Sequence, residues 1–82
     1  MEFYSPLDDH EIKTIKKHFV EVSVDRNPST PPDHWNVWGE VNGGYDQIGT
    51  LTTADVDRIY HAGVDVENHE AGDGSWEPQR AS

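Results

Sequence analysis

Residues 34–50 carry the pattern of a β-hairpin, and no other feature of the chain constrains the fold as strongly. Trp35, Val37 and Val41 share one parity, which is typical of the buried face of a strand. The sequence Asn42-Gly43-Gly44 follows and favours a tight turn. We therefore expect an antiparallel pair of strands here.

The turn allows two registers, which differ in the charges that they place opposite each other. A two-residue Asn42-Gly43 turn of type I′ sets three pairs opposite one another: Val37 with Ile48, Trp38 with Gln47, and Glu40 with Tyr45. A three-residue turn instead sets Glu40 opposite Asp46, and facing like charges are unfavourable. The sequence therefore favours the two-residue turn.

A helix is predicted from about residue 6 to residue 18. Ser5 is a good N-cap, Pro6 suits the first helical position, and Asp8 completes a capping box. Ile12, Ile15 and Phe19 then form a narrow apolar stripe that can face a sheet.

A second helix is predicted from about residue 53 to residue 62. Thr52 is its expected N-cap, and Gly63 is placed to end it with a positive φ. Val56 and Ile59 belong to its expected buried face.

The remaining segments complete an α+β pattern. Residues 19–25 alternate, with Val20, Val22 and Val24 on one face, and predict a strand. Residues 26–33 hold three prolines and predict a loop. Residues 64–67 can add a short edge strand. We expect one domain over residues 1–67, with a helix, a three-stranded antiparallel sheet and a helix, followed by a flexible acidic tail over residues 68–82.

Composition excludes several classes of protein. The 82 residues hold 16 Asp and Glu against 6 Lys and Arg, a formal net charge of -10, which is too acidic for a direct nucleic-acid binder. No window approaches the length of a membrane span. The chain has no cysteine, and its first residues lack the features of a secretory signal, so we expect a cytoplasmic protein.

No motif indicates catalysis or a specific metal site. His10 and His18 stand eight positions apart on the first predicted helix, too far to share an ion. Asn68-His69-Glu70 offers at most a weak metal site, and no serine lies in a nucleophile elbow. We expect a protein without enzymatic activity, metal or cofactor. A small metal-dependent or acid–base enzyme is the least favoured alternative.

The tryptophans suggest different roles. Trp35 shares the parity of Val37 and is expected in the core. Trp38 lies on the opposite face, where it either anchors a partner or is covered by the second helix or the tail. Trp76 either docks the tail or contacts a partner.

The distribution of charge is the most informative functional feature. Residues 27–79 hold ten acidic residues and a single base, Arg58. Such a surface repels nucleic acid and attracts proteins whose working groove is lined with Lys and Arg. The predicted partner-binding residues are Trp38, Glu40, Asp46, Asp55, Asp57, Asp65 and Glu67.

The expected function is inhibition or modulation of a nucleic-acid-processing protein by occupation of its basic groove. In size and charge the chain is similar to the DNA mimics with which phages and mobile elements block restriction or CRISPR effectors, although no shared motif supports this analogy. We expect a monomer or weak dimer with a protein partner and no membrane contact. In the alternative, the chain is an acidic adaptor whose charge is an adaptation to salt or to the need for solubility.

Overall fold

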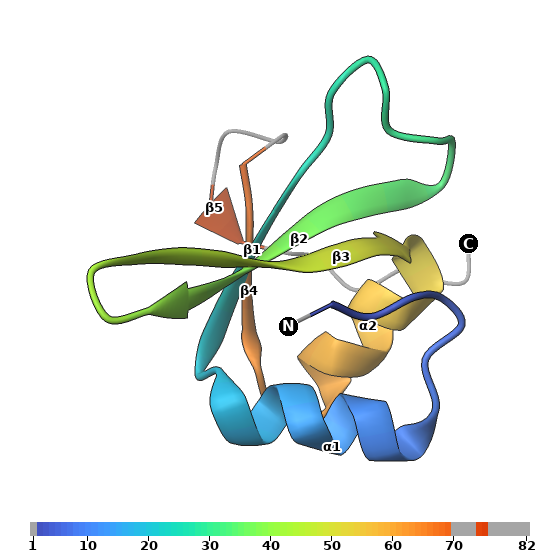
Figure 1. Ribbon diagram of the computed structural model, residues 1–82. Coiled ribbons are helices and arrows are strands. Elements are labelled where there is room, and N and C mark those ends of the chain that lie inside the picture. Colours follow the sequence, from blue (N-terminus) through green and yellow to red (C-terminus); the bar gives the residue numbers. More distant parts are fainter. Residues whose placement is uncertain (1, 70–73, 76–82) are drawn as a thin grey trace.

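The computed structural model describes residues 2–69 and 74–75, and these form a small α+β unit (Figure 1). Its elements follow one another in chain order: α1 (Asp9–His18), β1 (Glu21–Asp25), β2 (His34–Val41), β3 (Gly44–Thr52), α2 (Thr53–His61), β4 (Asp65–Asn68) and β5 (Gly74–Ser75). The described strands form one sheet in the order β3-β2-β1-β4-β5.

The prediction of a purely antiparallel, three-stranded sheet is wrong, because β4 pairs with β1 in parallel. The strands β1, β2 and β3 are successively antiparallel, so β3 and β4 run in the same direction. Parallel strands need a crossover, and α2 supplies it by carrying the chain from the β3 edge to the other side of β1. The segment 64–67, expected at most as an edge strand, therefore lies inside the sheet between β1 and β5.

Both helices pack on one face of the sheet and close a single core. The side chains that form it come from α1, from α2 and from the strands: Ile12, Ile15, Val56, Ile59, Val22, Val24, Val37, Ile48, Leu51 and Val66, with Leu7, Phe19 and Val64. Trp35 packs against this core as predicted, and its Nε1 donates a hydrogen bond of 2.9 Å to Thr53 Oγ1. Val20 does not join it, since it precedes β1 and is 84% exposed.

The first helix begins one turn later than predicted. Asp8 is its N-cap, and the side chains of Asp8 and Glu11 form a reciprocal capping box. Ser5 does not cap it; its Oγ donates to Asp55 and accepts a hydrogen bond from the Thr52 backbone. Ser5 therefore links distant segments of the chain instead of starting a helix.

The second helix agrees with its prediction. The Thr52 side chain accepts a hydrogen bond from the backbone N–H of Asp55, as expected of the N-cap. The helix ends at His61, and Gly63 follows with a φ of 111°. Local capping signals were thus sufficient to place this helix.

The hairpin has the predicted two-residue turn, with Glu40 opposite Tyr45 and Trp38 opposite Gln47. The turn is not of type I′, which needs a positive φ at both Asn42 and Gly43. Gly43 has a φ of 76°, but Asn42 does not have a positive φ, since Asp33 is the one non-glycine residue in the described chain that does. A positive φ at the second turn position alone is the pattern of a type II turn.

Farther from the turn the predicted register is wrong by one residue, because a β-bulge makes Val37 pair with Gly49 rather than with Ile48. Ile48 and Leu51 are three residues apart and would face opposite sides of a regular strand. The extra residue lets both side chains enter the core, where neither is exposed.

Most of the predicted flexible tail, residues 68–82, lies outside the described residues, and so does Trp76. The described part of it is ordered into strands at two places. Asn68 ends β4, and Gly74–Ser75 pair with Glu67 and Asn68.

Candidate functional site

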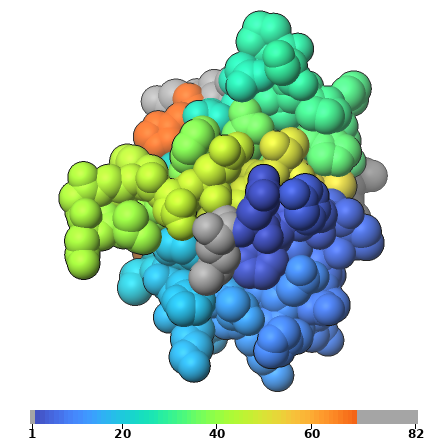
Figure 2. Space-filling model, in the orientation of Figure 1, coloured from blue at the N-terminus to red at the C-terminus, as the bar shows by residue number. Residues whose placement is uncertain are grey.

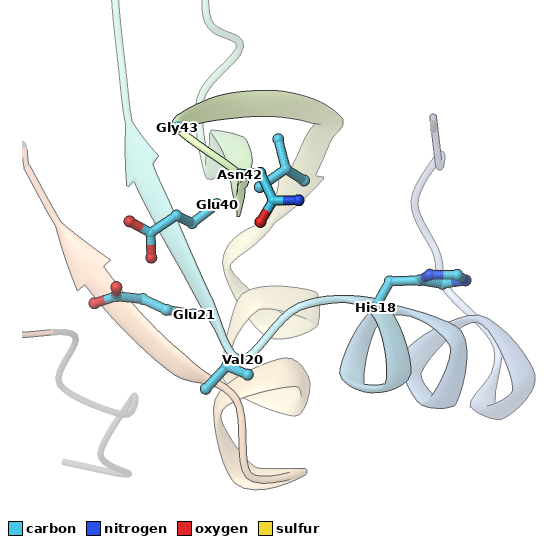
Figure 3. A pocket seen from close by; sticks show the side chains of 7 residues that line it. His18, Val20, Glu21, Glu40, Asn42 and Gly43 are labelled. Atoms are coloured by element: carbon cyan, nitrogen blue, oxygen red, sulfur yellow. The ribbon is translucent and has the colours of Figure 1, made fainter.

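The face of the sheet opposite the helices carries a row of carboxylates. Val22 pairs with Gly39, so the next residues, Glu21 and Glu40, are neighbours at the end of the β1–β2 pair. Glu21 also pairs with Asp65 on β4. Figure 3 shows Glu21 and Glu40 extending to the same side from their strands. Three acidic side chains thus lie side by side on three adjacent strands.

A second row lies beside the first and adds another carboxylate. Ser23 pairs with Trp38 on β2 and with Glu67 on β4. Ser23 is buried beneath its neighbours, whereas Trp38 and Glu67 are half-buried. Neither described helix packs on this side of the sheet. We call the surface formed by Glu21, Trp38, Glu40, Asp65 and Glu67 the acidic face.

The carboxylates of the acidic face lie close together, and their effect is seen at Glu21. The pKa of Glu21 is raised, first by a hydrogen bond with Glu67, then by partial burial and by the negative charges of Glu67 and Glu40. The negative charge of Glu21 is therefore disfavoured in the folded protein. A cationic group from outside would relieve the repulsion.

Two hollows adjoin the acidic face. The one drawn in Figure 3 has a volume of about 530 Å³ and lies between the end of α1, at His18, and the hairpin tip, at Asn42 and Gly43. Figure 2 shows this hairpin tip as a protrusion from the body of the molecule. The second, of about 340 Å³, is lined by Ser23, Asp25, Trp38, Tyr45 and His69.

Four of the seven predicted partner-binding residues come together on the acidic face: Trp38, Glu40, Asp65 and Glu67. Asp46 pairs with Gly39 and so has the opposite parity, and Asp57 lies on α2. These two acidic residues are therefore separate from the acidic face.

Asp55 is also separate, because its carboxylate is used inside the protein. It is 3% exposed, and it accepts hydrogen bonds from Ser5 Oγ at 2.5 Å, from the Leu7 backbone at 3.2 Å and from Arg58 Nη1 at 3.2 Å. Asp55 therefore cannot serve as a contact on the surface.

Sequence reasoning missed three residues of this region, Glu21, Asp25 and Tyr45. All three stood on polar faces of predicted strands, so the alternation of each strand was a usable signal. The missing information was the order of the strands, since the contacts of Glu21 with Glu40 and Glu67 depend on β1 lying between β2 and β4.

Within residues 2–69 and 74–75, no group of three or more His, Asp or Glu is arranged to hold a metal ion. Of the described helices, none has the length and apolar character needed to cross a membrane.

Comparison with known proteins identifies no relative, since no protein-family model, curated protein or solved structure matches the chain.

Proposed function

We propose that the protein binds a nucleic-acid-binding protein through the acidic face and, by occupying its basic groove, inhibits or modulates it. The observation that supports this most is the placement of Glu21, Glu40, Asp65 and Glu67 on neighbouring strands. A positively charged groove would neutralise these carboxylates together, as it neutralises the phosphates of nucleic acid. In this respect the protein would act as a DNA mimic of the kind used against restriction or CRISPR enzymes.

The raised pKa of Glu21 adds a physical reason. Like charges on adjacent strands weaken a fold, so their presence here is a cost to the free protein. A basic partner converts that repulsion into attraction, which makes the same carboxylates favourable in the complex.

The test compares two variants with the same change in charge. One carries Glu21→Gln, Glu40→Gln and Glu67→Gln on the acidic face; its control carries Glu2→Gln, Asp33→Asn and Asp46→Asn, all at exposed positions outside it. Each tagged protein is used to capture proteins from host lysate, which are then eluted with duplex DNA or with salt and identified by mass spectrometry.

The wild type and the control are expected to retain a nucleic-acid-binding protein that duplex DNA releases, and the acidic-face variant is expected to lose it. Equal capture by both variants would contradict the proposal, because total charge rather than the acidic face would then govern binding.

A second candidate is an acidic adaptor whose charge serves solubility or adaptation to salt. The observation that favours it is the position of Asp33, Asp46 and Asp57 outside the acidic face, since an adaptation to solvent would distribute charge over the molecule. Its partner would be retained in high salt and would not be displaced by DNA.

A further inference from the structure

The hollow of about 340 Å³ beside the acidic face has aromatic walls. Trp38 and Tyr45 stand on the paired strands β2 and β3, and they are near-diagonal neighbours because Tyr45 faces Glu40. Tyr45 is 59% exposed, so its ring is accessible to a group from outside. Two rings at an accessible hollow are suited to hold a flat group by stacking.

The Trp38 ring offers carbon surface rather than a hydrogen-bond donor. Its Nε1 is buried and has no hydrogen-bond partner among the described residues, while the side chain as a whole is half-buried. The accessible part of the ring therefore cannot donate to an anion or a carbonyl group. Its π-face carries partial negative charge and attracts cations.

One carboxylate lines this hollow and others lie on the strands beside it, so the local charge favours a cation over an anion. Asp25 lines it directly, Glu40 stands opposite Tyr45, and Glu67 stands beside Ser23 on the adjacent strand. An anion would meet repulsion here, whereas a cation would be held both by the rings and by the carboxylates.

We propose that this hollow receives the guanidinium group of an arginine from the partner protein. Guanidinium is planar, stacks on aromatic rings and is less strongly hydrated than the ammonium group of lysine, so it fits a site with both aromatic and acidic walls. The inference rests on the proposed function, because it names the side chain by which a basic partner is anchored to the acidic face.

The probes are an oligo-arginine and an oligo-lysine peptide of equal length, titrated into the full chain at constant salt. Affinity is measured by calorimetry, and the indole N–H signals are followed by NMR, with Trp38 assigned from Trp38→Phe. The wild type is expected to bind the arginine peptide about fivefold more tightly than the lysine peptide, with a shift of the Trp38 signal.

The variants separate stacking from charge. Trp38→Leu and Tyr45→Leu should abolish the preference for arginine while leaving lysine-peptide affinity nearly unchanged, and Trp38→Phe should retain part of it. Tyr4→Leu is the matched control, because Tyr4 is 71% exposed but does not line the hollow. Since Tyr45 is also exposed, Tyr45→Leu tests the inference even if Trp38→Leu fails to fold.

Equal affinity of the wild type for the two peptides would overturn the inference, and so would an arginine preference that survives Tyr45→Leu. Failure to bind either peptide at low salt would overturn it as well. None of these results decides the proposed function, which is tested separately by comparing capture with the acidic-face variant and with its control.

Discussion

Asp55 and Glu21 are both acidic, but their surroundings give them opposite effects on the fold. The Asp55 carboxylate is surrounded by donors from Ser5, Leu7 and Arg58, and it joins the N-terminal segment to α2. Arg58 extends this link, because it also donates to the Leu7 carbonyl and to Asp9. Glu21 has acidic neighbours instead, so its negative charge is disfavoured.

The variant Asp55→Asn is expected to lower the free energy of unfolding by about 2–3 kcal/mol, because buried hydrogen bonds to an ionised group are lost. Urea denaturation measures this change. Asp65→Asn removes the same charge from an exposed position and should change stability by less than about 0.5 kcal/mol. Equal stabilities of the two variants would show that the Asp55 network does not stabilise the fold.

The variant Glu21→Gln is expected to melt a few degrees above the wild type at pH 7. Because folding raises the pKa of Glu21, its stabilising contribution is present below the unfolded value, about 4.3, and is lost as pH rises through the folded value. The difference in Tm should therefore close as pH falls to about 4. Asp33→Asn should give a smaller gain, and an equal gain would indicate a general effect of net charge.

At the scale of elements, two segments from outside the sheet pack directly against glycines of its strands. The Phe19 ring, at the C-cap of α1, lies over Gly39 on β2. At the bulge, the Phe3 backbone donates to the Ile48 carbonyl, and a Cβ on Gly49 would lie 2.3 Å from the Phe3 oxygen. Glycine is required at both places because another segment of the chain occupies the side-chain position.

The variant Gly39→Ala is expected to destabilise the protein by about 1–3 kcal/mol. Its Cβ would lie 2.4 Å from Phe19 Cε1, so the ring must move out of the core. Gly44→Ala is the matched control, since no neighbour lies within 4 Å of its Cβ position and its φ is not positive. Thermal denaturation of both variants measures the difference, and a Gly39→Ala protein as stable as Gly44→Ala would refute the contact.

At the scale of the whole molecule, the relevant feature is the placement of charge on the two sides of the sheet. Both helices cover one face of the sheet and share its core, while acidic side chains gather on the other face. The three lysines, Lys13, Lys16 and Lys17, all lie on α1 and so on the helix side. The lysines are therefore separated from the acidic face, and this separation favours oriented binding to a basic surface.

The folded state is expected to persist at low salt, with a Tm that rises modestly as NaCl screens the repulsion among its acidic groups. Thermal unfolding followed by circular dichroism from low to molar NaCl measures this. If cooperative unfolding appears only near molar salt, the fold depends on salt and the adaptation alternative is favoured. The Tm of a small protein of neutral pI, measured at the same NaCl concentrations, serves as the reference.

Local signals were sufficient for a large part of the fold. Thr52 and Gly63 correctly marked the two ends of α2, because capping depends on residues within one turn of the helix. The Asn42-Gly43 turn and the repulsion expected between Glu40 and Asp46 determined the hairpin register near its tip. Trp38 and Glu40 were therefore placed on the correct face without any knowledge of the other strands.

The tertiary structure decided the features that depend on distant segments. Ser5 caps no helix because its hydroxyl donates to Asp55 and accepts from the Thr52 backbone, and the same contact helps to hold the Asp55 carboxylate away from the surface. The parallel β4, the bulge at Gly49 and the entry of Glu21 into the acidic face all follow from which segments pack together. Periodicity and capping act over a few residues, whereas strand order and burial depend on contacts across the whole chain.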